Sequence, residues 1–167
     1  MVIVLKLDIT DKKISDLLIE DGRMSCSEIA KRIGGISERA VRYRIERLIN
    51  NNIIAVHGNV NSRGLGLEVF ADVFIEVEPS QVQEIAKKLA EYESVSYVAC
   101  STGERDISIQ VFAKNNNDLY NFVTEIVGQI PGVRKTHTSL VPIIIKDDHI
   151  WHIPSFCIQD DGTKKTQ

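Results

Sequence analysis

The chain has 167 residues, enough for one medium-sized domain or two small ones, and its 43% hydrophobic and 26% charged residues are typical of a globular protein. No apolar run approaches the roughly 20 residues of a membrane-spanning helix, and the first residues lack a signal-peptide pattern, so we expect a cytoplasmic protein. The net charge of −3 is uneven, because residues 1–63 carry +3 and residues 64–167 carry −6. This division predicts an N-terminal part that binds a polyanion and a C-terminal part that does not.

The N-terminal part predicts three helices, each preceded by a side chain that can cap free backbone N–H groups. The expected caps are Asp8, Ser25 and Ser37, and Ser25 is followed by Glu28 in the Ser-x-x-Glu pattern of a capping box. Residues 34–35, both glycine, separate the second helix from the third. A short β segment is expected over residues 53–60. The third helix is expected to run to about residue 50, with an inner stripe of Val41, Ile45, Leu48 and Ile49.

A polar, glycine-containing linker at residues 61–67 precedes a change of pattern. Alternating apolar residues predict strands near 69–77, 95–101, 106–113 and 133–141. Helical spacing predicts one helix after Pro79 and a second that carries Leu119, Phe122, Val123 and Ile126. The order β-α-β-β-α-β is that of the ferredoxin-like fold. The predicted fold class is therefore α+β, with a helix-turn-helix domain at 1–60, the linker at 61–67, a ferredoxin-like domain at 68–145 and a C-terminal extension at 146–167.

The ferredoxin-like order places both helices on one face of the sheet and leaves the other face open. Phe70 and Phe74 lie on that open face, beside Asp72 and Glu76. Since aromatic rings bury about 150–250 Å² each, a partner sheet is expected to cover these two. We therefore predict that the second domain forms a homodimer with Phe70 and Phe74 in the interface.

The second and third helices together predict a helix-turn-helix, whose second helix enters the major groove of DNA. Arginine can bind guanine O6 and N7 with two hydrogen bonds, so Arg39 and Arg42 are the candidates for base contacts. The alternative is a solvated face on which Glu38 and Glu46 pair with Arg42. Phosphate contacts are expected from Lys31, Arg32, Arg44 and Arg47. The predicted DNA-binding set is Ser37, Glu38, Arg39, Arg42, Tyr43, Arg44, Arg47, Lys31 and Arg32.

Motif residues along residues 7–142 match one known family. They are Leu7-Asp8 with Asp11, Gly22-Arg23, Ser25 with Glu28-Ile29-Ala30, Ser37 with Val41, Arg44-Ile45 with Leu48, Ile54, Leu65-Gly66, Thr102-Gly103 with Asp106, and Pro131-Gly132-Val133. The chain therefore resembles the Lrp/AsnC (feast/famine) family of bacterial and archaeal transcriptional regulators. This resemblance implies a winged helix-turn-helix joined to a ligand-sensing (RAM) domain, in dimers that assemble into tetramers or octamers. A dimer would bind double-stranded DNA at an imperfect palindrome.

The resemblance also implies an effector site for an amino acid or a related metabolite, in clefts between dimers near the turn at 102–106. There Asp106 would hold the ammonium group, and backbone amides near Gly103 would take the carboxylate. The alternative is that Gly103 only permits a tight turn and Asp106 only caps it. The predicted effector set is Thr102, Gly103, Glu104, Arg105, Asp106, Thr136 and Thr138.

Three features depart from the family pattern. The turn at residues 33–37 is one residue longer than usual, and Asn52 replaces a glycine, a mild change because both residues tolerate positive φ. Residues 146–167 lie beyond the match, and the segment around Trp151 is expected to pack on a neighbouring subunit. Of the widely spaced Cys26, Cys100 and Cys157, which argue against a disulfide framework, Cys100 is expected to be buried.

Catalytic residues, a cofactor and a metal are not expected. The sequence contains no Gly-rich phosphate loop and no Gly-x-Ser-x-Gly elbow. His149, His152 and Cys157 lie in a segment without the helical period that would gather them round a metal. Two alternatives to a ligand-modulated regulator remain: a tetrapyrrole enzyme, since the sirohaem decarboxylases resemble this architecture, and an effector-independent DNA-organising protein.

Overall fold

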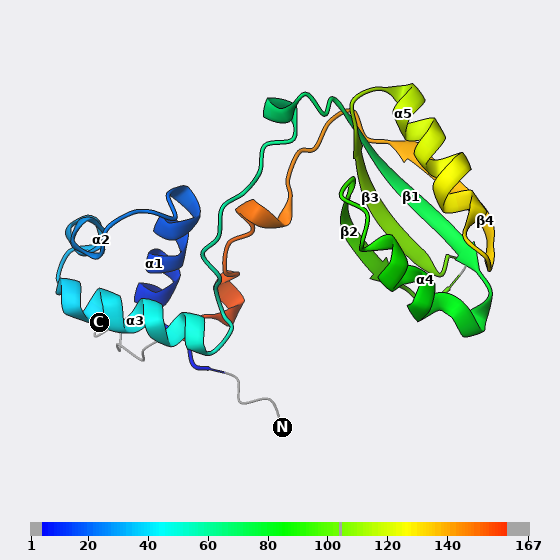
Figure 1. The fold of residues 1–167 in the computed structure, drawn as a ribbon. Coiled ribbons are helices and arrows are strands. Elements are labelled where there is room, and N and C mark those ends of the chain that lie inside the picture. The colour runs from blue at the N-terminus through cyan, green and yellow to red at the C-terminus, as the bar shows by residue number, and fades with distance from the viewer. Residues whose placement is uncertain (1–4, 104, 160–167) are drawn as a thin grey trace. The chain divides into compact units, whose positions relative to one another are not determined.

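A computed structural model describes residues 5–103 and 105–159, which form two compact units (Figure 1). The first unit contains the described residues up to Asn59 together with those from Lys146 onward, and the second unit is Val60–Ile145. Residues 146–159, hereafter the tail, thus return to the N-terminal unit of their own chain, whereas the sequence analysis placed the segment around Trp151 on a neighbouring subunit. No helix in the described part of the chain has the length and apolar composition needed to cross a membrane.

The N-terminal unit contains three helices, α1 (Ile9–Glu20), α2 (Cys26–Ile33) and α3 (Glu38–Asn50), and all three predicted caps are present. Asp8 forms a full capping box with Asp11, while the Ser25 and Ser37 hydroxyls each accept one backbone N–H at 3.2 Å. The reciprocal half of the box predicted at Ser25 is not formed, because the Glu28 carboxylate instead binds the Arg32 side chain.

A small core holds the three helices together. Ile14 of α1, Ile29 of α2 and Val41 of α3 are fully buried and contact one another. The expected inner residue Ile49 is 41% exposed, because its side chain points away from the buried side of α3, which the preceding residue Leu48 occupies. Asn52 then adopts a φ of +55°, which confirms that this residue occupies a left-handed position where glycine is the usual choice.

The β segment predicted over residues 53–60 is not formed. A strand needs a hydrogen-bonded neighbour, and none of the described residues pairs with this segment. Ile53, Ile54 and Val56 instead face a cavity that the tail closes from the other side. The tail contains two one-turn 3₁₀ helices, Asp148–Ile150 and Ser155–Cys157.

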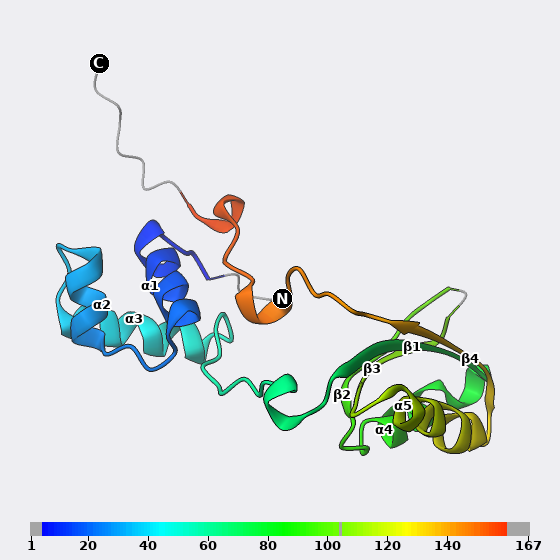
Figure 2. The same cartoon turned by 90° about the horizontal axis from the view of Figure 1, so that it is seen from above.

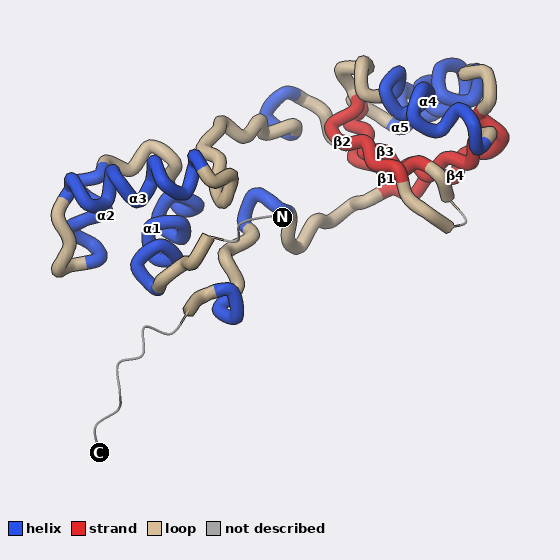
Figure 3. The backbone as a smooth tube through the Cα atoms, turned by 90° about the horizontal axis from the view of Figure 1, so that it is seen from below, coloured by secondary structure: helices blue, strands red, loops and turns tan. Residues whose placement is uncertain are grey.

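The second unit is the predicted β-α-β-β-α-β fold. Its strands are β1 (Val69–Val77), β2 (Val95–Cys100), β3 (Ile107–Ala113) and β4 (Val133–Leu140), paired antiparallel in the order β2-β3-β1-β4. The helices α4 (Val82–Leu89) and α5 (Asn116–Asn121) cover one face of this sheet (Figures 2 and 3). We call the uncovered side the outer face.

The core of the second unit lies between the sheet and the two helices. Alternate residues of β1 and β3 are buried there, together with Ile85, Leu89 and Leu119 from the helices. Two expectations were wrong. Ile126 is 38% exposed, because a π-helical turn at Phe122–Ile126 changes the helical period that was used to place it. Cys100 is exposed because β2 is an edge strand and Cys100 ends it.

Candidate nucleic-acid interface

One side of α3 is exposed in the part of the chain that the structure describes. Arg39, Arg42, Tyr43 and Glu46 follow the i, i+3, i+4, i+7 spacing of a single helix face, and all four are exposed. Val41 and Leu48, on the opposite side, are fully buried. We call these four exposed residues the recognition face. It begins next to Ser37, whose hydroxyl caps the helix.

Two of the exposed predicted contact residues, Arg42 and Arg32, already have carboxylate partners. The Arg42 guanidinium binds Glu38 at 2.9 Å, and both side chains are more than half exposed. Arg32 binds Glu20 at 2.8 Å and Glu28 at 3.3 Å. Exposed pairs of this kind contribute about 0–1 kcal/mol, so a phosphate or base can replace the carboxylate at little cost. Within the described residues, no salt bridge involves Arg39 or Lys31.

Arg44 and Arg47 point inward, toward α1. Arg44 binds both Asp8 and Asp11 at 2.7 Å, and Arg47 binds Asp11, whose carboxylate is completely buried. We call these four residues the Asp11 clamp. Burial alone would raise the pKa of Asp8, but hydrogen bonds from the Asp11 N–H and from Arg44, with the charge of Arg44, lower it. Burial likewise opposes the charge of Arg44, and the two aspartates nevertheless raise its pKa.

The Asp11 clamp joins the recognition helix to the first helix. Arg44 lies three residues after Val41 and one turn before Leu48, and this places it on the inner side of α3. The geometry therefore gives Arg44 and Arg47 a structural role, although the sequence analysis named them as phosphate contacts. The helical spacing of Arg44 from Val41 carries a signal that could have separated it from Arg39 and Arg42, whereas the spacing of Arg47 carries none.

The turn between β2 and β3 contains most of the predicted effector residues. Gly103 has a φ of +136°, and the Ser101 hydroxyl donates to the Arg105 carbonyl at 2.8 Å. The Asp106 carboxylate accepts the Val77 N–H at 2.8 Å, so at least one of its oxygens already holds the sheet and the turn together. Glu104 lies outside the described residues. Thr102 is exposed beside Gly103.

The sheet register divides the predicted effector residues between two faces. Thr136 and Thr138 are paired with Ile75 and Val73, and therefore lie on the side of the sheet that α4 and α5 cover. Arg105 lies over the ring of Phe74, 4.2 Å from its centroid. Phe74 belongs to the outer face, opposite the two threonines.

The outer face is more aromatic than the sequence analysis indicated. Phe70 packs against Phe112 of β3, with ring centroids 4.7 Å apart. Phe74 is paired with His137 of β4, and Phe70 and Phe74 are both half-buried in the single chain. The sequence analysis missed Phe112, although its even position in the alternation of β3 places it on this face.

The same two domains, in the same order along the chain, occur in known proteins. Residues 7–55 match the sequence profile of winged helix-turn-helix DNA-binding domains, and residues 70–150 match that of the Lrp/AsnC ligand binding domain. An uncharacterised helix-turn-helix transcriptional regulator of Pyrococcus furiosus is 40% identical over 84% of this chain and 95% of its own length. The chain belongs to the Lrp/AsnC family. The regulator LrpA of Pyrococcus abyssi is 35% identical, over 81% of this chain and 96% of its own.

Solved structures of Lrp/AsnC proteins share the fold. AsnC of Escherichia coli superposes with a TM-score of 0.77 at 23% identity, covering 86% of this chain and 99% of its own. The regulator NMB0573 of Neisseria meningitidis, solved as a complex with L-methionine, gives a TM-score of 0.78 at 25% identity, covering 85% and 94%. These relatives are transcriptional regulators and not enzymes, so the tetrapyrrole-enzyme alternative is not supported. Among the described residues, no three His, Cys, Asp or Glu side chains are grouped to hold a metal.

Proposed function

We propose that this Lrp/AsnC regulator binds an imperfect palindrome in double-stranded DNA as a homodimer, with Arg39 and Arg42 reading bases. The observation that carries the proposal is that the arginines of α3 are divided between an exposed side and an inner side of the helix. Arg39 and Arg42 lie on the exposed recognition face, whereas Arg44 and Arg47 are bound to Asp11. An exposed basic helix face that is held rigidly from behind matches what a major groove requires.

The proposal assigns phosphate contacts to Lys31 and Arg32 at the end of α2. Both are exposed, and they sit next to the glycine turn that leads into α3. Ser37, Glu38 and Tyr43 complete the interface: Ser37 fixes the start of α3, and Glu38 holds Arg42 until a base replaces it. Dimerisation through Phe70, Phe74 and the rest of the outer face would place two such helices about 34 Å apart, one turn of DNA.

The proposal also includes modulation by an amino acid bound near the turn at 102–106. It is supported by the match to a ligand binding domain and by the L-methionine complex of the Neisseria relative. The occupied oxygen of Asp106 favours a ligand held partly by backbone groups near Gly103, with Asp106 shaping the turn. A coupling of about 1–3 kcal/mol between this site and DNA is sufficient for regulation.

The test begins with selection of genomic DNA fragments that bind the purified chain, with and without each amino acid. Arg39→Ala and Arg42→Ala should each weaken binding to a selected site by about 5- to 150-fold for each half-site, and should relax the sequence preference at one base pair of each half-site. Arg23→Ala is the matched control, because Arg23 is an exposed arginine of the same unit outside α2 and α3. If the wild-type chain binds no duplex at low salt, or if the Arg23 variant loses as much affinity, the proposal fails.

A further inference from the structure

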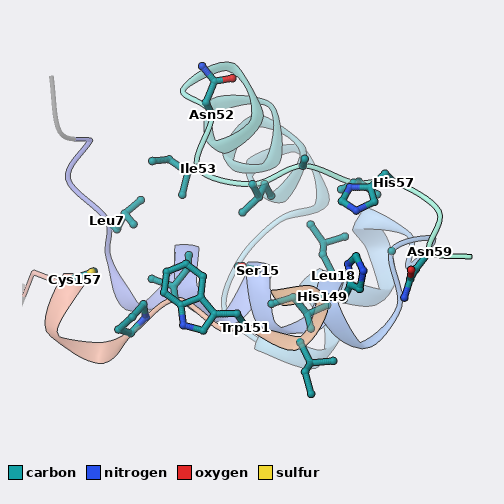
Figure 4. Close-up of a pocket in the computed structure, with 18 residues that line it drawn as sticks. Leu7, Ser15, Leu18, Asn52, Ile53, His57, Asn59, His149, Trp151 and Cys157 are labelled. Atoms are coloured by element: carbon teal, nitrogen blue, oxygen red, sulfur yellow. The ribbon is translucent and has the colours of Figure 1, made fainter. Parts of the chain in front are cut away.

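The tail is held against the helix-turn-helix unit at two places. Leu7 and Ile158 form a parallel β bridge, and the Gln159 N–H donates to the Leu7 carbonyl at 2.9 Å. The His152 ring lies 2.8 Å from the Asp16 carboxylate of α1. These contacts leave a cavity of about 700 Å³ between α1, residues 52–59 and the tail (Figure 4). Cavities of this size accept small organic molecules.

Most of the side chains that line the cavity are apolar, and its polar residues include Ser15, Asn52, Asn59 and the two histidines. Leu18, Ile54 and Trp151 are among its walls, and no Asp, Glu, Lys or Arg belongs to the described residues that line it. Figure 4 shows His57 and His149 close together at one end, beside Asn59. The two imidazole rings meet edge to face, with their centroids 6.1 Å apart.

This lining selects a ligand by charge. The described lining offers the ammonium group of a cationic or zwitterionic molecule no carboxylate to pair with. A neutral imidazole offers one N–H donor and a protonated imidazole offers two, so the pair at 57 and 149 can donate to both oxygens of a carboxylate. The apolar walls then cover a hydrocarbon or aromatic body. An amino acid, the effector proposed for the second unit, does not fit.

We propose that this cavity is a second ligand site, which binds a small apolar monocarboxylate with its carboxylate at His57 and His149. The tail supplies one of the two histidines and one wall, so the site exists only while the tail is docked. Residues 52–59, which form part of the cavity wall, directly follow α3. A bound ligand would therefore contact the segment that leads out of the recognition helix. The proposal rests neither on the proposed effector site nor on DNA binding.

The experiment uses Trp151, the only tryptophan of the chain and part of the cavity wall, as the reporter. Octanoate added to the full-length protein should shift Trp151 emission to the blue and saturate. Affinity should rise about fourfold for each methylene from butanoate to octanoate, since each added methylene is buried. Octylammonium should not bind. Octanol binding as tightly as octanoate, or an emission that never saturates, would overturn the proposal.

The two histidines are tested by replacing both. The double variant His57→Ala with His149→Ala should bind octanoate at least tenfold more weakly and leave octanol binding unchanged. Tyr120→Ala, which removes an exposed ring of α5 in the other unit, is the control and should behave as the wild type. Circular dichroism identifies a variant that has lost its fold. A chain that binds octanoate but no DNA refutes only the proposed function, and a chain that binds DNA but no octanoate refutes only this site.

Discussion

The stability of the helix-turn-helix unit should depend strongly on Asp11, whose carboxylate is fully buried. It accepts hydrogen bonds from the Asp8 N–H at 3.1 Å, from Arg44 at 2.7 Å and from Arg47. Asp11→Asn keeps the shape of the side chain and removes its charge. The amide then turns an N–H toward arginines that can only donate, which removes the hydrogen bond of one of the two guanidiniums to residue 11.

The expected loss follows from how buried the partners are. Removing one member of a buried ion pair costs about 3–5 kcal/mol, because the other charge stays buried. Arg44 and Arg47 remain 25% and 28% exposed, and Arg44 keeps Asp8 at 2.7 Å, so solvent and Asp8 recover part of that energy. We therefore expect Asp11→Asn to lower the free energy of unfolding by about 2–3 kcal/mol. For a unit of this size the melting midpoint should fall by roughly 10–20 °C.

Trp151 lies in the same unit and reports its unfolding through fluorescence during heating or urea titration. Asp16→Asn is the control, since Asp16 also lies on α1 and pairs with Lys12 and His152, but near the surface. That change should cost less than about 1 kcal/mol. Equal losses for the two variants would show that the Asp11 clamp contributes no more than a surface pair, and the structural role of Arg44 and Arg47 would be refuted.

Three further predictions concern the tail, the acid limb of stability and the outer face. Deleting the chain from residue 146 onward should destabilise the N-terminal unit by about 1–2 kcal/mol, because one backbone hydrogen bond and the His152–Asp16 pair are lost. Urea unfolding measures this loss, and an unchanged midpoint would exclude a docked tail. Burial would raise the pKa of Asp8 and of Asp16, but their hydrogen bonds lower both pKa values below 3.8. The two carboxylates should therefore contribute stability above about pH 4 that is lost as the pH falls through the lowered pKa values, and replacing both by Asn should flatten the dependence of the unfolding free energy on pH. Phe74→Asp should convert a dimer to a monomer by light scattering, and Tyr120→Asp, on the exposed side of α5, should not; a dimer that survives Phe74→Asp excludes the proposed interface.

The parts of the fold that local chemistry determines were predicted from the sequence. Asp8, Ser25 and Ser37 cap the three helices because their oxygens satisfy N–H groups that the helix itself leaves free. The strands followed from alternation, since β1 buries every second residue against α4 and α5. The tolerance of Asn52 for a positive φ was predicted for the same reason, because this backbone angle depends only on the residue and its turn.

The parts that depend on distant residues were not predicted. The return of the tail to α1 rests on Leu7–Ile158 and Asp16–His152 contacts, which join opposite ends of the chain and leave no periodic signal. Arg44 and Arg47 were counted as free positive charge because composition records charge without its partners. Asp11 neutralises much of that charge from 33 residues away, as its hydrogen bond to Arg44 shows. Phe112, in contrast, obeys the alternation of β3 and was open to prediction.

The pairing of these arginines has a measurable consequence for DNA binding. Each phosphate that a protein neutralises on B-DNA contributes about −0.9 to the slope of log K against log salt concentration. If Lys31, Arg32, Arg44 and Arg47 all contacted phosphates, a dimer would make eight such contacts and give a slope of about −7. With Arg44 and Arg47 held by Asp8 and Asp11, only Lys31 and Arg32 of each helix-turn-helix unit remain as phosphate contacts. The expected slope is then about −4. Anisotropy titrations at several salt concentrations distinguish these values. A slope near −7 would mean that the Asp11 clamp opens on DNA. The difference between the exposed and the clamped arginines of α3 would then no longer be a reason to assign base reading to Arg39 and Arg42.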